Sequence, residues 1–323
     1  MTSNREEEVR SKRKLGSYLL KVLISAVVLA LVLRIVDLSY LGRLMLSADP
    51  FWLSLALLSF FLQQLIQIYM WGDLLRAKGT DLPFRLISYV FFVGIFFGTF
   101  LPSTAAVDVV RVAAMTRHLK NKIDSITSML LFRVIGTLVL IFISLIFILG
   151  YRDQIENPAI ANLILGFSVF MVGGFLVVSN SFFRDISVRI FHWIRIHRLA
   201  EITENFFRSL SEYMKYRSVL IRIVVLSVVI QVMRIVMVYW IGISLGVDIS
   251  ILYYFMFIPI ITVLTMLPIS LAGIGISEGS YVYFFAVAGV GNAEAVSISL
   301  LYFLMSIVIF IFSGIVYLLG KNE

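Results

Sequence analysis

Five ionisable side chains lie within or beside long apolar segments of this 323-residue chain. A charged group at bilayer depth costs about 3 kcal/mol on insertion scales, so each one needs a partner or a function. Guanidinium groups can hold a phosphate or a carboxylate, and a buried carboxylate can bind a cation or carry a proton. The candidate residues for substrate binding or coupling are Asp108, Arg111, Arg133, Arg234 and Glu278.

The spacing of these residues leaves several roles open. Asp108 and Arg111 are three apart and would share one face of a helix, where they can pair. A structural ion pair and a role in binding or coupling are both open for them. Arg133 and Arg234 fall inside apolar runs, and for each a phosphate contact and a salt bridge to a carboxylate are open. Glu278 could complement a helix dipole, but we favour a functional role for it.

Two Leu-Pro steps interrupt the apolar segments that contain the carboxylates. We expect each proline to end a helix and a hydroxyl side chain to cap the next one. The cap is Ser103 or Thr104 in the first region and Ser277 in the stretch LPISLAGIGISEG (267–279). Two helix N-termini would then point toward the middle of the protein, where their free N–H groups suit an anion. The predicted hairpin breaks are Pro102, Ser103, Pro268, Gly273, Gly275 and Ser277.

Composition indicates a membrane protein. The chain is 60% hydrophobic and 14% charged, whereas a soluble domain is roughly 45–50% apolar and 25% charged. It has no cysteine and only three scattered histidines, so we expect no disulfide, no metal site and no cofactor. We attribute the net charge of +8 to basic residues that set the orientation of the chain in the membrane and contact anionic lipids. Nucleic acid is not expected, since no module of the kind that reads bases is present.

Apolar runs define the predicted elements. A run of about 20 residues crosses a hydrocarbon core of about 30 Å. Two other regions, 84–117 and 251–290, each consist of an apolar leg, a Leu-Pro break and a second leg of about 13 residues, which is too short to cross. We predict that both are re-entrant helical hairpins. The six predicted full spans are 15–37, 51–72, 126–149, 158–179, 219–245 and 295–320.

Basic residues set the predicted orientation. With both termini inside, most of the 27 lysines and arginines lie inside, as the positive-inside tendency requires. If residues 84–101 crossed the membrane once, the basic segment 117–122 would lie outside, and the orientation of all later segments would be inverted. The first run has no cleavage site after it, so we interpret it as an uncleaved anchor. The fold class predicted is an all-α polytopic protein of the cell membrane, forming one integral membrane domain over 1–323.

The predicted elements repeat along the chain. Residues 15–150 contain span, span, hairpin and span beginning inside, and 158–320 contain the same order beginning outside. This is an inverted-topology repeat, an architecture common among secondary transporters. The segment 181–215 between them is amphipathic, and we expect it to lie in the headgroup plane against anionic lipid. On the second span Gln63, Gln64 and Gln67 form a polar patch that we interpret as interhelical hydrogen bonding.

Three stretches resemble a known family. LPSTAAVDVVRVAAM, MLLFRVIGTLVLIF and LPISLAGIGISEG are similar to the membrane domain of the lysylphosphatidylglycerol synthetase/flippase family, which includes stand-alone flippase-like proteins. In two-part members this domain is taken to move an aminoacylated lipid across the bilayer, and a soluble domain makes that lipid. This chain ends at Glu323 without such a domain, so the resemblance implies transport. The matching positions are Pro102, Asp108, Arg111, Arg133, Pro268, Gly273, Gly275 and Glu278.

The predicted function is translocation of a phospholipid or lipid-linked intermediate between leaflets, through a polar cavity between the hairpins. The protein is then not an enzyme, and no GxxxxGK[ST] motif for ATP is present. One alternative is a membrane-embedded lipid or polyprenyl-phosphate transferase with Asp108 and Glu278 as acid and base. The other is a non-catalytic subunit that serves a separate synthase or glycosyltransferase.

Overall fold

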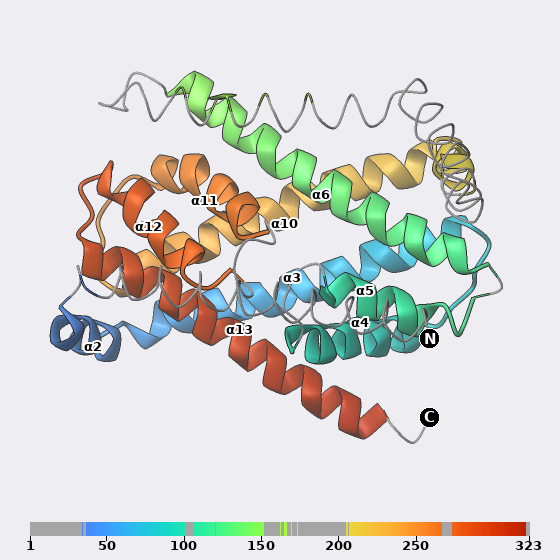
Figure 1. Cartoon of the computed structure of the whole chain (residues 1–323), viewed down its shortest axis with the longest axis horizontal. Coiled ribbons are helices and arrows are strands. Elements are labelled where there is room, and N and C mark those ends of the chain that lie inside the picture. Colours follow the sequence, from blue (N-terminus) through green and yellow to red (C-terminus); the bar gives the residue numbers. More distant parts are fainter. Residues whose placement is uncertain are drawn as a thin grey trace, which may run out of the picture.

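The computed structural model describes residues 37–100, 106–119, 121–151, 207–266 and 273–320, together with positions 34, 162, 165, 166, 169, 173 and 205. Most of the predicted spans 15–37 and 158–179, most of the amphipathic segment 181–215, and the breaks at Pro102, Ser103 and Pro268 lie outside these residues. The described helices (Figure 1) are α2 (Leu38–Leu46), α3 (Pro50–Ala77), α4 (Phe84–Thr99), α5 (Ala106–Met115), α6 (Lys122–Gly150), α10 (Arg217–Ser244), α11 (Ile251–Met266), α12 (Ile276–Ala286) and α13 (Asn292–Gly320).

Four of these helices, α3, α6, α10 and α13, are long and apolar enough to cross a membrane. They coincide with four of the predicted spans and confirm an α-helical, multi-pass membrane protein. The helices α4 and α11 have 16 residues each. At 1.5 Å per residue they are about 24 Å long, less than a hydrocarbon core of about 30 Å. The short α2 was not predicted from the sequence.

Local sequence signals explain where the long helices begin. The Asp49 carboxylate accepts a hydrogen bond from the Phe51 N–H at 2.8 Å, and Pro50 occupies the first helical position of α3. Asn121 caps α6 in the same way through the Ile123 N–H at 3.2 Å. Both caps satisfy backbone donors that the first turn of a helix leaves unpaired.

The helices α3 and α10 pack side by side and antiparallel (Figure 1). At one end the Asp49 N–H donates to the Ser244 carbonyl at 2.8 Å. At the other end the Arg222 Nε donates to the Asp73 carboxylate at 2.8 Å. The start of α3 therefore lies beside the end of α10, and the end of α3 lies beside the start of α10.

The short helices form two antiparallel pairs. In the first, α5 packs closely on α4, because a Cβ atom on Gly94 or Gly98 would overlap Arg111 or Val107. This is the small-xxx-small spacing that allows close helix approach in membranes. In the second, α11 and α12 pair through the rings of Phe257 and Phe284, whose centroids are 5.7 Å apart.

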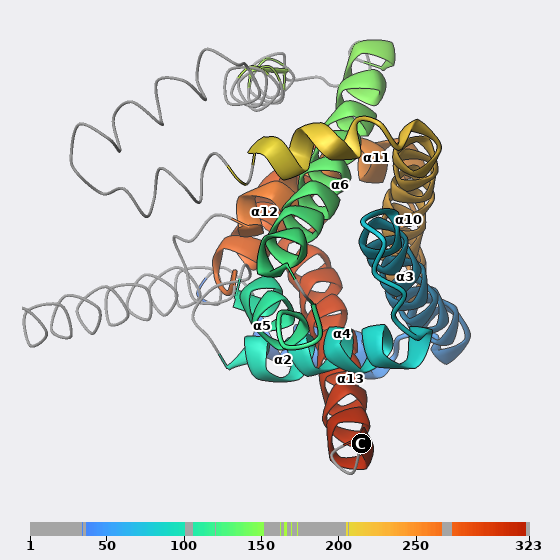
Figure 2. The same cartoon turned by 90° about the vertical axis from the view of Figure 1, so that its right-hand side faces the viewer.

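Each short pair also packs against a long helix of the other half of the chain. The helix α4 contacts α13, and α11 contacts α6 (Figure 2). Within each half, α5 contacts α6 and α12 contacts α13. The helices α3, α4, α5 and α6 thus correspond to α10, α11, α12 and α13. Each of these contacts made by a helix of one half has a counterpart made by the corresponding helix of the other half.

The helix ends gather at two places. Lys78, just after α3, is paired with Glu212, which precedes α10, and its Nζ is 3.8 Å from the Asp124 carboxylate in the first turn of α6. At the opposite end of α3, the Tyr40 hydroxyl of α2 donates to Glu294 in the first turn of α13 at 2.9 Å. The pair α4–α5 thus connects the end of α3 to the start of α6, and these two ends lie together. The pair α11–α12 likewise connects the end of α10 to the start of α13 at the other end of the bundle.

Candidate functional site

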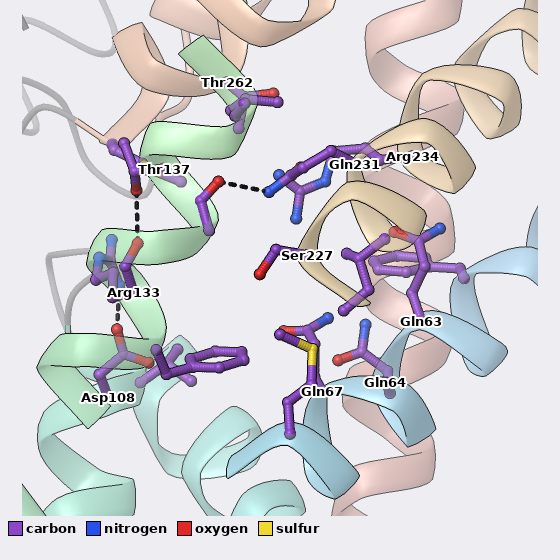
Figure 3. A pocket seen from close by; sticks show the side chains of 18 of the residues that line it. Gln63, Gln64, Gln67, Asp108, Arg133, Thr137, Ser227, Gln231, Arg234 and Thr262 are labelled. Carbon is purple, nitrogen blue, oxygen red and sulfur yellow. Dashed lines mark hydrogen bonds and ion pairs between the residues drawn. The ribbon is translucent and has the colours of Figure 1, made fainter. Parts of the chain in front are cut away.

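Asp108 is held between two arginines. It is the third residue of α5, and its carboxylate accepts a hydrogen bond from Arg111 Nη1 at 3.2 Å, one turn further along the helix. Its second oxygen forms an ion pair with Arg133 of α6 (Figure 3). Arg111 is buried and also donates to the Phe91 carbonyl of α4 at 3.3 Å. The predicted Asp108–Arg111 pair is confirmed, and Arg133 uses one of its two predicted options, a salt bridge to Asp108.

A first cavity of about 380 Å³ lies beside this ion-pair cluster. Residues of α3, α5, α6, α10 and α11 line it, and their polar side chains face a common space (Figure 3). Three arginines and one aspartate are among them. The polar and charged residues include Gln63, Gln64, Gln67, Asp108, Arg111, Arg133, Thr137, Ser227, Gln231, Arg234 and Thr262.

One face of α10 supplies a polar stripe to this cavity. Ser227, Gln231 and Arg234 are spaced i, i+4 and i+7, which places them on one side of a helix. The Gln231 side-chain amide donates to the Gly136 carbonyl of α6 at 2.9 Å. Within the described residues, Arg234 has no hydrogen bond or ion pair, although a salt bridge was one of its predicted options.

The three glutamines of α3 do more than join helices. Gln63 donates to the Met237 sulfur of α10 at 3.7 Å and to Ser59 at 3.4 Å, which fits the interhelical role expected for the patch. Gln64 and Gln67, however, line the first cavity together with Gln63. The spacing of these residues on one helical face was the signal that could have identified them as cavity residues.

A second cavity of about 320 Å³ adjoins the first. Residues of α11, α12 and α13 line it, among them Glu278, Ser277 and Ser299, and the end of α4 contributes as well. Its boundary with the first cavity consists of shared residues, which are Val107, Arg234, Thr262, Thr265 and Tyr302. Open space bordered by charged side chains therefore extends from the α4–α5 pair to the α11–α12 pair, with Arg234 at the junction.

The turn before α12 places Glu278 at the second cavity. Gly273 and Gly275 adopt φ angles of 83° and 85°, the left-handed region that favours glycine. Glu278 is 4% exposed, and its carboxylate accepts a hydrogen bond from the Gly275 N–H at 2.6 Å. The prediction that Ser277 caps α12 is wrong, because the N-cap is Gly275 and Glu278 supplies the acceptor. The Ser277 hydroxyl instead lies 2.8 Å from that of Ser299 on α13.

The structure thus brings together all five candidate residues around two adjoining cavities. Asp108, Arg111 and Arg133 border the first, Glu278 borders the second, and Arg234 borders both. No group of three or more His, Cys, Asp or Glu residues that could hold a metal ion is found in the described part of the chain. Sequence reasoning missed several polar cavity residues, among them Thr137 and Thr262. Two others, Ser227 and Gln231, are recognisable only by their helical spacing from Arg234.

Comparison with known proteins identifies a family. The sequence model of the lysylphosphatidylglycerol synthase TM region matches residues 18–314. The chain is also 25% identical over 288 residues to a UPF0104 membrane protein of Methanothermobacter thermautotrophicus, an alignment that covers 83% of this chain and 85% of the relative. The matched region includes α2 to α12, the part of α13 up to residue 314, and every residue that lines the two cavities. The chain therefore belongs to the family of the lysylphosphatidylglycerol synthase transmembrane region, whose members are multi-pass membrane proteins.

Proposed function

We propose that the protein moves a phospholipid or a lipid-linked intermediate between the leaflets of the cell membrane, with the headgroup passing through the two adjoining cavities. The observation that carries the proposal is the presence of three arginines and two carboxylates around two adjoining cavities, which lie between the two short helix pairs and meet at Arg234. Ionisable groups at membrane depth mark substrate and ion pathways. The acyl chains remain in the surrounding lipid.

The candidate residues take different roles in this proposal. Arg111 is buried and bonded to Asp108 and the Phe91 carbonyl, so it holds α5 in place. The Arg133 side chain is 30% exposed, and it faces the cavity beside its ion pair with Asp108. Arg133 and Arg234 therefore bind the phosphate, since guanidinium groups match its geometry. Glu278, in the second cavity, couples the movement to a proton.

The path of the chain through the membrane is part of the same proposal. The ends of α3 and α6 that flank α4–α5 lie together at Lys78 and Asp124, so α4–α5 enters and leaves on one side. The pair α11–α12 does the same on the opposite side, because α2, α13 and the end of α10 meet near the start of α3. Two re-entrant hairpins, six spans and an inverted repeat with both termini inside account for these contacts.

The exchanged packing supplies a way to alternate access. The α4–α13 and α11–α6 contacts are related by exchange of the two halves. In transporters built from inverted repeats, one half rocks against the other around a fixed central site. Closing one of these contacts while the other opens would expose the cavities to one side at a time. A separate synthase or glycosyltransferase would supply the lipid.

The test is lipid translocation in proteoliposomes, followed by quenching fluorescent phospholipids from outside. The wild type should move lipid faster than empty liposomes, and Asp108→Asn and Glu278→Gln should each abolish the gain. Ser297→Ala is the matched control, because the Ser297 hydroxyl bonds within α13 and lines neither cavity. If no lipid, whatever its headgroup and including a polyprenyl phosphate, moves faster than in empty liposomes, the proposal is wrong.

A further inference from the structure

Two buried polar atoms of the first cavity have no hydrogen-bond partner in the structure: Ser227 Oγ and Gln231 Oε1. Ser227 is 1% exposed and Gln231 is 6% exposed. Buried polar atoms in proteins are nearly always bonded, so an unpaired one indicates a missing partner. Figure 3 shows the Ser227 hydroxyl directed into the space between α3, α6 and α10. Both atoms lie on the α10 stripe that ends at Arg234.

The two atoms differ in what they need. The amide nitrogen of Gln231 already donates to Gly136, so its oxygen requires a donor. The Ser227 hydroxyl can both donate and accept. A hydroxyl group of a ligand satisfies both requirements. An ammonium group could donate to Gln231, but it would then lie next to the guanidinium of Arg234, one turn along the same face, and like charges at that distance repel.

The charges around the cavities point the same way. Asp108 is already paired with Arg111 and Arg133, and the Glu278 carboxylate is bonded to the Gly275 N–H. Arg234 has no ion-pair partner within the described residues. Three arginines and only two carboxylates border the cavities, so their net charge is positive and disfavours a cationic headgroup. An anion, in contrast, would compensate Arg234.

We infer that the headgroup recognised here is a phosphate-linked polyol or sugar without a cationic group. Its phosphate binds Arg234 with help from Arg133, and its hydroxyls bond to Ser227 Oγ and Gln231 Oε1. This inference rests on the proposed function and names its substrate class. Two lipids share the chemistry: a phosphatidylglycerol and a polyprenyl-phosphate sugar. The cavities, of about 380 and 320 Å³, are in the usual range of ligand sites.

Lipid binding to the purified full-length protein in detergent tests the inference, with native mass spectrometry as the readout. The probes are phosphatidylglycerol, a polyprenyl-phosphate hexose, phosphatidic acid, phosphatidylethanolamine and lysyl-phosphatidylglycerol. At least one of the first two should bind about tenfold more tightly than phosphatidic acid, which has the phosphate but no hydroxyls. Whichever of the two binds identifies the source of the headgroup.

Two variants connect this preference to the unpaired atoms. Ser227→Ala and Gln231→Met should each reduce the preference over phosphatidic acid by about fivefold, the effect of one lost hydrogen bond. The control Ser297→Ala should leave it unchanged. The melting temperature of Ser227→Ala should stay the same or rise, because the serine now buries an unpaired hydroxyl. A purely structural serine would lower the melting temperature without changing the lipid preference.

Defined results overturn the inference. Tighter binding of lysyl-phosphatidylglycerol or phosphatidylethanolamine would show that the site takes a cation. An unchanged preference in both variants would show that the unpaired atoms hold only water. Because binding in detergent needs no transport, selective binding without translocation in proteoliposomes would reject the proposed function alone. Equal translocation of all phospholipids, with no binding preference, would reject the headgroup class alone.

Discussion

Asp108 and Glu278 are each the third residue of a short helix that borders a cavity, yet their carboxylates have different partners. Asp108 bonds to Arg111 and Arg133, from its own helix and from α6. Glu278 bonds to the Gly275 N–H at the start of its own helix. The equivalent positions of the two halves therefore hold carboxylates with different partners. Two arginines neutralise Asp108, and a backbone N–H bonds to Glu278.

This difference predicts opposite effects on stability. Asp108→Asn leaves two guanidinium groups without their counterion, and breaking a buried ion pair costs about 3–5 kcal/mol. Since the Asp108 side chain is 17% exposed, we expect a loss near the lower end. Glu278→Gln keeps an acceptor for the Gly275 N–H and should cost less than about 1 kcal/mol. Unfolding in detergent measures both, and the reverse order would contradict the assigned partners.

Gly98 determines how closely α5 approaches α4. Gly98→Ala would place a methyl group on the backbone of Val107, next to Asp108. Overpacking of this kind costs about 1–3 kcal/mol, and the shift of α5 should also reduce translocation. The control is Gly42→Ala in α2, where a Cβ atom would meet nothing within 4 Å. Equal melting temperatures for the two variants would show that α4 and α5 are not in close contact.

Thiol labelling tests the path through the membrane. The chain has no cysteine, so Lys122→Cys and Asn292→Cys each introduce a single thiol at an exposed position. We expect a membrane-impermeant reagent to label Lys122→Cys only from inside and Asn292→Cys only from outside. Each residue begins the long helix after a short pair. Labelling of both from one side would rule out two hairpins that enter from opposite sides.

The ion pair of Lys78 with Glu212 predicts a pH dependence. The hydrogen bond from Lys78, followed by its charge, lowers the pKa of Glu212 below its ordinary value. A lowered pKa stabilises the folded state above the unfolded value of about 4.3, and this stabilisation is lost as the pH falls through the lowered pKa.

The melting temperatures of the wild type and of Glu212→Gln, measured from pH 7 to pH 3, test this dependence. The wild type should be more stable at pH 7, and the difference should shrink below about pH 4. A difference that stays constant with pH would show that the charge of Glu212 is not involved. Glu212 lies outside the cavities, so translocation at pH 7 should change little.

The sequence by itself determined the features that depend on one segment. Apolar length predicted the long helices, because about 20 residues are needed to cross a hydrocarbon core. The three-residue spacing of Asp108 and Arg111 predicted their pair, because residues three apart on a helix are neighbours. The glycines at 273 and 275 predicted the turn before Glu278, since φ above zero is open mainly to glycine. The cap at Ser277 failed because the side chain of Glu278 already satisfies the backbone there.

Only the tertiary structure decided which segments meet. Arg133 pairs with Asp108 across 25 positions, and Arg234 lies at the junction of two cavities. In a membrane helix the lipid-facing and the protein-facing sides are both apolar, so the pattern of one helix does not show which side packs inward. The rotation of α10 that turns Ser227, Gln231 and Arg234 toward the cavities follows from its packing against α3 and α6, which no single segment contains.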